Sequence, residues 1–354
     1  MKRWLLVVCG LMALASPVAF AQVASAPDLI SAMREPANQL LESLSGGTGG
    51  FAAMTGLDAE LSYPLDDAER QNWQYWPAIR IGMPVERMTA QQRLWAHDLL
   101  AVLLSSAGYL KATSIMQLED FLLTENRDGL PRSVGHYRLV IFGAPSDADW
   151  AWRFEGHHVS LSVSIAGDEM TVTPSFFGAN PAQIRTGPLT GLRIHGRLED
   201  LARQLVQSLE GRQRDTAIVA DEAPREIFAG LIGVPRERWN EWLTALQPAG
   251  VPISELNEMQ RYWVQLILAE IIGNYTDEIA AQYREDIDVS ALRFAWMGST
   301  EAGLPHYFRL QGGDFMFEYD NVQRDGNHVH SVWRSKSNDF GRNVLADHYL
   351  SATH

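Results

Sequence analysis

The stretch RFEGHHVSLSVSI, residues 153–165, carries the pattern that decides the fold. After the pair His157 and His158, apolar residues alternate strictly with serines from Val159 to Ile165. Alternation with a period of two is typical of a strand that has one apolar and one polar face. We therefore predict a half-buried strand that opens with one imidazole on each face, His158 on the polar side.

The same series of motifs occurs twice in the chain. A Gly-x-Pro motif is followed by TAQQRLWAHDLLAVLLSS from Thr89 in the first copy, and by NEMQRYWVQLILAEIIGN from Asn257 in the second. Each segment begins with a residue type that caps helices, and a glutamine follows three residues later, as in a capping box. We expect a helix in each copy, and then a second helical segment over 112–124 and over 277–287.

Each copy then continues into strands. HYRLVIFGAPSDADWAWRFEG (136–156) in the first copy corresponds to LRFAWMGSTEAGLPHYFRLQG (292–312) in the second. The predicted fold is α+β, built from a duplicated helix–helix–strand–strand module with mixed or antiparallel sheets, an arrangement compatible with pseudo-twofold symmetry. The alternative is a chance similarity between two α+β stretches.

The N-terminus, MKRWLLVVCGLMALASPVAFAQ, has basic residues, an apolar run and then Ala19-Phe20-Ala21. This is the layout of a secretory signal peptide over residues 1–21, although a membrane anchor is the alternative. We therefore expect a periplasmic or secreted protein. The mature chain is predicted to consist of an N-terminal α+β repeat with a helical lead-in (22–185), a loop, helix and linker region (186–235) and a C-terminal α+β repeat (236–354).

The composition excludes several classes of function. Cys9 is the only cysteine and lies in the predicted signal peptide, so the mature chain has no disulfide, thiolate nucleophile or cysteine-ligated metal. The net charge of −14 repels phosphate backbones, and we expect no nucleic-acid partner. No apolar run after the predicted signal peptide is long enough to span a membrane.

Histidines from both copies form a candidate metal site. Alignment of the copies places His158 on the same strand face as Glu318 and Asp320. An Arg-Asp-Gly-Asn turn then leads to His328 and His330, which share one face of the return strand because they are two residues apart. Imidazole and carboxylate ligands in this arrangement suit zinc, copper or iron.

The candidate residues fall into three groups. The candidate metal ligands are His157, His158, His328 and His330, and the sequence leaves open whether His157 or His158 binds the metal. The candidate catalytic residues are Glu318, Asp320 and Arg334, with Glu318 as a fourth ligand or general base. The candidates for binding a small anionic substrate are Arg153, Arg309 and Trp152. The alternatives are histidines that brace a hairpin, arginines paired with acids, and a tryptophan of the core.

Several of these motifs resemble one known family. They are WAWRFEGHHVSLSVSI, TPSFFGANPA, HYFRLQGGDFMFEYDNVQ, NHVHSVWR and NDFGRNVLADHY, and the similarity extends from about Tyr63 to Tyr349. The sequence resembles the family called protein of unknown function 3500. This resemblance implies an exported or soluble protein and assigns no activity.

The residues therefore support two functional hypotheses. The first is an exported metal-dependent enzyme, a hydrolase or an oxidoreductase with hydrolysis favoured, that acts on a small anionic substrate. The second is a non-catalytic periplasmic protein that binds a metal or a small ligand.

Overall fold

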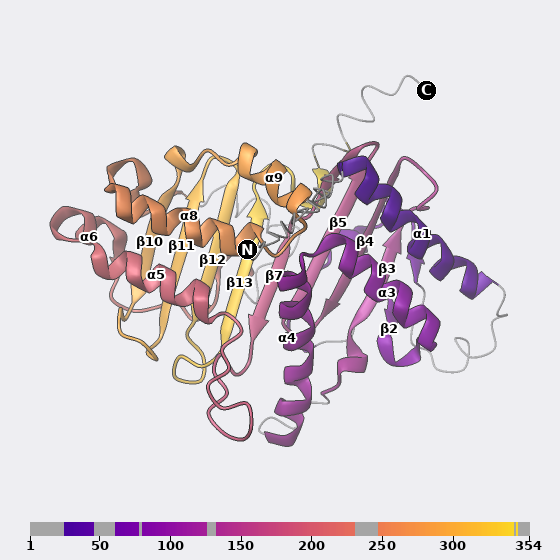
Figure 1. Ribbon diagram of the computed structural model, residues 1–354, viewed down its shortest axis with the longest axis horizontal. Helices are drawn as coiled ribbons and strands as arrows, with labels where there is room; N and C mark the ends of the chain where they lie inside the picture. Colours follow the sequence, from indigo (N-terminus) through magenta and orange to yellow (C-terminus); the bar gives the residue numbers. More distant parts are fainter. Residues whose placement is uncertain are drawn as a thin grey trace, which may run out of the picture.

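The chain forms an α+β fold, seen in a computed structural model (Figure 1). The structure describes residues 25–45, 61–77, 80–125, 132–230, 247–342 and 345. The predicted signal peptide over 1–21 lies outside the described residues. Within them, no helix is both long enough and apolar enough to cross a membrane.

The helices of the described part vary from two turns to more than five. They are α1 (Ala26–Ser45), α3 (Ala90–Leu103), α4 (Ser106–Glu125), α5 (Gly196–Ser208), α6 (Gly211–Ala217), α8 (Glu258–Ile272) and α9 (Asp277–Asp286). Both predicted capping boxes are present: Thr89 caps α3 together with Gln92, and Asn257 caps α8 together with Gln260. Local hydrogen bonds between residues three positions apart therefore define where these two helices begin.

The strands of the described residues all belong to one mixed sheet. They are β1 (Ser62–Tyr63), β2 (Met83–Pro84), β3 (Arg138–Phe142), β4 (Asp149–Gly156), β5 (Val159–Ala166), β6 (Glu169–Thr171), β7 (Ser175–Ala179), β8 (Ile218–Ala220), β9 (Val251–Pro252), β10 (Arg293–Gly298), β11 (His306–Gly312), β12 (Phe315–Asn321) and β13 (Val329–Ser335). Most pairs are antiparallel, whereas β1 with β3 and β8 with β10 are parallel.

The order of the strands joins the two halves of the chain at the centre of the sheet. The path runs β1-β3-β4-β5-β7-β13-β12-β11-β10-β8, so the strands up to residue 179 lie on one side and the later strands on the other. The antiparallel pair β7–β13 is the junction, with Phe177 opposite Ser331. Segments far apart in sequence are therefore neighbours at this junction.

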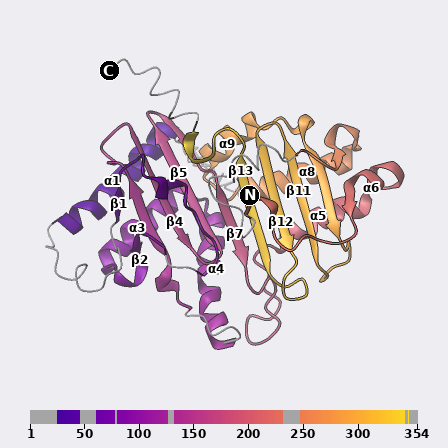
Figure 2. The ribbon, with the colours of Figure 1, turned by 180° about the vertical axis from the view of Figure 1, so that it is seen from behind.

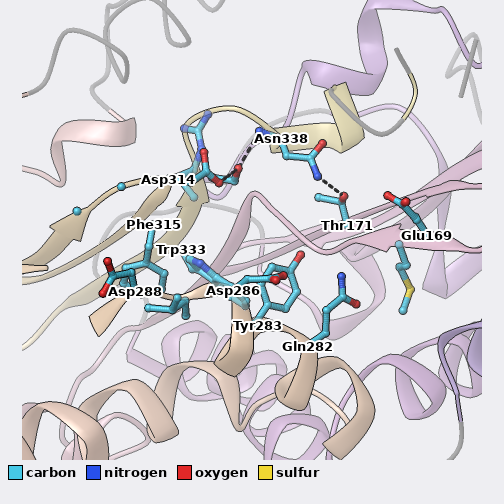
Figure 3. A pocket seen from close by; sticks show the side chains of 16 residues that line it. Glu169, Thr171, Gln282, Tyr283, Asp286, Asp288, Asp314, Phe315, Trp333 and Asn338 are labelled. Carbon is cyan, nitrogen blue, oxygen red and sulfur yellow. Dashed lines mark hydrogen bonds between the residues drawn. The ribbon is translucent and has the colours of Figure 1, made fainter. Parts of the chain in front are cut away.

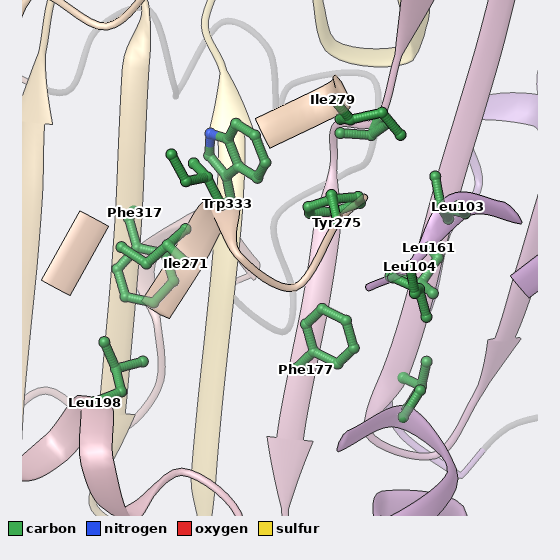
Figure 4. Packing of buried hydrophobic residues seen from close by; sticks show 14 of the residues in the cluster. Leu103, Leu104, Leu161, Phe177, Leu198, Ile271, Tyr275, Ile279, Phe317 and Trp333 are labelled. Atoms are coloured by element: carbon green, nitrogen blue, oxygen red, sulfur yellow. The ribbon is translucent and has the colours of Figure 1, made fainter. Parts of the chain in front are cut away.

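The helices cover one face of the sheet, and Figure 2 shows the other face without them. Under the helices lies the main hydrophobic core, where Leu161, Phe177 and Trp333 from the strands meet Ile271 and Tyr275 (Figure 4). The opposite face has a smaller core in which loops and short 3-10 helices pack on the sheet. Its buried residues are Trp73, Tyr75, Phe176, Ile227, Ala229, Met316, Val332 and Phe340.

The second core changes one prediction made from the alternating stretch. The apolar residues of β5 face the helices, as the period of two predicts. The serines on its other face are also buried, since Ser160, Ser162 and Ser164 are 0%, 5% and 2% exposed. The strand that was predicted to be half-buried is therefore buried on both faces, because segments distant in sequence cover its polar side.

Candidate metal centre

His158 occupies a strained turn position that fixes its direction. It lies between β4 and β5 with a φ of +66°, a region that histidine enters more readily than most side chains. Its N–H donates to the carbonyl of Tyr75 at 2.9 Å, and its carbonyl accepts from the Gly178 N–H at 2.8 Å. Both backbone groups are therefore held, the N–H by the segment that contains Tyr75 and the carbonyl by β7.

Two histidines at the start of β13 meet His158. The Nε2 atoms of His158 and His328 are 2.8 Å apart, across 170 positions of sequence. The ring of His330 lies 5.2 Å from that of His158 and 4.6 Å from that of His328, centroid to centroid. One ligand atom from each of the three residues lies within 4.8 Å of the other two. The geometry therefore brings together the three histidines of the sequence hypothesis.

Two buried carboxylates surround His330. Its Nδ1 is 2.5 Å from Oε1 of Glu226 and 3.7 Å from Oδ1 of Asp320, the residue opposite it on β12. The other Asp320 oxygen, Oδ2, is buried without a hydrogen-bond partner among the described residues. A carboxylate that holds one ring nitrogen of a histidine orients the other nitrogen toward a metal. Glu226 is placed for this role.

Burial sets the protonation of the cluster. Burial lowers the pKa of His158 and of His328 well below the usual histidine range, with further lowering by the neighbouring histidines. Both imidazoles are therefore neutral near pH 7, the form that binds metals. Burial also acts to lower the pKa of His330, but the carboxylates of Asp320 and Glu226 outweigh it and raise that pKa. A metal would have to displace one proton from His330.

His157 has a different environment from His158. Its Nδ1 contacts Oε1 of Glu119 on α4, and Nη1 of Arg132 lies 2.8 Å from the same nitrogen. Its ring lies 3.7 Å from that of His158, centroid to centroid, at an interplanar angle of 30°. The two rings therefore lie together and not on opposite faces as predicted. The reason is that both residues belong to the turn, where strand alternation does not apply. Two groups of buried side chains could hold a metal ion: His158, His328 and His330, and Glu226, Asp320 and His330. His157 belongs to neither group.

Glu318 binds the backbone of residues 228–229, a segment that covers this face of the sheet. Its carboxylate accepts the N–H groups of Phe228 at 2.8 Å and Ala229 at 2.7 Å, and the hydroxyl of Tyr307 at 2.6 Å. The side chain is fully buried. These contacts attach residues 228–229 to the sheet, and Glu318 belongs to neither group of potential ligands.

The predicted arginines and tryptophan also lie in other contacts. Arg153 pairs with Glu155 at 3.1 Å, and Nε of Arg334 pairs with Oδ2 of Asp339 at 2.5 Å. Arg309 is buried and sits opposite Glu318 in the β11–β12 register. Trp152 belongs to the core beneath the helices.

Sequence reasoning missed Glu226, Glu119 and Arg132. Glu226 lies in the stretch interpreted as loop, helix and linker, yet it is only 6% exposed. The one local signal was the apolar pair Ile227-Phe228 directly after it. Glu119 and Arg132 carried no sequence signal, because they contact His157 only through tertiary packing, across 38 and 25 positions of the chain.

A separate cavity of about 310 Å³ lies at the other ends of β12 and β13 (Figure 3). Phe315 and Trp333 line it together with Tyr283 of α9, and its acidic residues include Asp286 and Asp314. Because the histidines lie near the end of β12 and the start of β13, this cavity is distinct from the candidate metal centre.

The comparisons with known proteins identify a family and no activity. A family described as "Protein of unknown function (DUF3500)" matches residues 28–342, a range that includes the three clustered histidines. No curated protein and no solved structure matches the chain.

Proposed function

The chain belongs to the DUF3500 family, and we propose that it binds one divalent transition metal ion through His158, His328 and His330. The observation that carries this proposal is the approach of the buried His158 and His328 Nε2 atoms to 2.8 Å. Zinc, copper and iron are the candidate ions, because they accept imidazole and carboxylate ligands.

The apposed nitrogens need only a small movement to receive an ion. A metal bound at about 2.0–2.1 Å from two nitrogens in tetrahedral geometry separates them by roughly 3.3 Å. The two Nε2 atoms at 2.8 Å would therefore move apart by roughly 0.5 Å. At the observed separation one imidazole donates a hydrogen bond to the other. Nδ1 of His328 and Oδ2 of Asp320 are buried and have no hydrogen-bond partner among the described residues.

Elemental analysis of purified protein tests the metal proposal. After loading with zinc, copper or iron, we expect about one ion per chain in the wild type and a loss of most of it in His158→Ala, His328→Ala and His330→Ala. His136→Ala is the matched control, because His136 is half exposed and lies beside Glu86. A wild type that takes up none of the three metals would refute the proposal.

We further propose that the centre is hydrolytic, with Asp320 as the general base. Its Oδ2 is buried beside His330 and has no partner among the described residues, so it could accept a proton from a metal-bound water. Asp320 takes this role in place of Glu318, whose carboxylate already accepts three hydrogen bonds. The alternative is a non-catalytic binder in which Asp320 completes the ligand set.

Asp320→Asn separates the hydrolase from the binder. For the hydrolase we expect the variant to keep its metal and to lose about 100-fold or more in the rate of cleaving a 4-nitrophenyl ester or phosphate. For the binder we expect no hydrolysis by the wild type and loss of metal from the variant. The first result supports catalysis, and the second excludes it.

We also propose that the protein is exported and that its chain contains a duplicated module. The N-terminal layout supports a periplasmic or secreted location, and N-terminal sequencing of the protein from a periplasmic extract should begin at Gln22. Two features support the duplicated module: the capping boxes at Thr89 and Asn257, and a strand order that proceeds from β3 or from β10 to the β7–β13 junction.

A further inference from the structure

A cavity of about 500 Å³ lies at the end of the sheet where the histidines gather. It is bounded by the turn between β12 and β13, the loop after β7 and the C-terminal part of α4. Phe121 and Leu122 of α4 form its apolar side. Its volume is in the range of sites for small molecules.

The polar side of the cavity is rich in groups that bind anions. Arg185 and Arg324 line it and are both exposed, and Asp325 is the only acidic residue among the described residues that line it. The chain as a whole carries a net charge of −14, so an anion is repelled from most of its surface. Two arginines within one cavity therefore form a local exception to the overall charge.

The cavity adjoins the candidate metal centre along the chain. Asn327 lines it and is followed in sequence by the proposed ligand His328. Asn327 is fixed against the loop after β7, because its side-chain oxygen accepts the Gln183 N–H at 2.7 Å and its carbonyl accepts the Ala182 N–H at 3.0 Å. These hydrogen bonds hold the loop after β7 against the residue that precedes His328.

Asn180 supplies a second polar group in the wall of the cavity. It follows Ala179, the β7 residue that pairs with Val329 beside the histidines. Its side chain is 2% exposed, and its amide oxygen has no hydrogen-bond partner among the described residues. A buried acceptor of this kind is stabilised by a donor such as a hydroxyl or a water.

We propose that this cavity binds a small hydroxylated oxyanion, a carboxylate or a phosphate ester, with its anionic group on Arg185 and Arg324. The inference rests on the proposed metal centre, because the ion would act on the part of the molecule nearest His328. It differs from the sequence prediction, which gave the anion to Arg153 and Arg309; both of these arginines are buried.

Inorganic phosphate is the probe for this inference. Calorimetric titration of the metal-loaded full chain at low ionic strength gives the dissociation constant for the wild type, Arg324→Gln and Arg185→Gln. The matched control is Arg225→Gln, which makes the same charge change at an exposed arginine in a different cavity that also contains Asp221 and Glu222. Metal content is measured on every sample.

We expect each cavity variant to raise the dissociation constant for phosphate about tenfold, and the control to change it less than about twofold. All variants should retain their metal. Phosphate affinity that is unchanged in both cavity variants, or reduced equally in the control, would overturn the inference while leaving the metal centre intact. A wild type that takes up no metal overturns the proposed function separately, and it also removes the basis for placing a substrate here.

Discussion

Gly178 provides a direct test of the geometry around His158. It lies on β7 opposite His330, and a Cβ atom added to it would be 2.9 Å from Cδ2 of His158 and 2.7 Å from the carbonyl oxygen of Val329. Ordinary contacts begin at 3.4 Å, so Gly178→Ala requires the imidazole to move by about 0.5 Å and the carbonyl by about 0.7 Å. Gly178 is not among the glycines with positive φ, so its backbone accepts alanine.

The displacement predicts both a stability change and a metal effect. Overpacking of this size costs about 1–3 kcal/mol of the free energy of unfolding. Metal–nitrogen distances are tolerant to about 0.2 Å, which is less than the required shift of the imidazole. We therefore expect the metal affinity of Gly178→Ala to fall by about 10-fold to 100-fold.

Two measurements on the same samples check this expectation. Urea unfolding of the metal-free protein gives the change in stability, and competition with a chelator gives the metal affinity. Gly108→Ala is the control, because its Cβ would meet the Asn274 carbonyl oxygen at 1.9 Å, in a contact of α4 with the segment between α8 and α9. Metal affinity in Gly178→Ala equal to the wild type, or reduced no further than in Gly108→Ala, would refute the reasoning.

Two further predictions concern stability. Arg334→Met leaves Asp339 buried without its 2.5 Å partner, and we expect a loss of about 3–5 kcal/mol in urea unfolding with metal content unchanged; a variant as stable as the wild type contradicts this. Burial lowers the pKa of His306 from 6.5 to about 4, so protonation favours the unfolded chain and stability falls as the pH drops from 6.5 to 4. The loss amounts to about 3 kcal/mol. His306→Phe keeps the stack on Trp296 and should flatten the acid side of the stability profile, and an unaltered profile would exclude His306 as its cause.

The sequence alone predicted those features that depend on neighbours in the chain. The capping boxes at Thr89 and Asn257 could be read directly, because each involves residues three positions apart. The alternation in β5 identified a strand and its core face. The spacing of His328 and His330 placed both on one side of β13, since neighbouring side chains on a strand point in opposite directions.

The tertiary structure decided which residues form the site. His158 meets His328 because β7 and β13 pair at the centre of the sheet, and its turn conformation places its ring beside that of His157. Glu226 reaches His330 from a covering segment, whereas Glu318 is occupied by backbone N–H groups of that same segment. Local periodicity specifies the face on which a side chain lies. Contacts made by distant segments then determine whether that side chain meets a ligand, a backbone amide or the core.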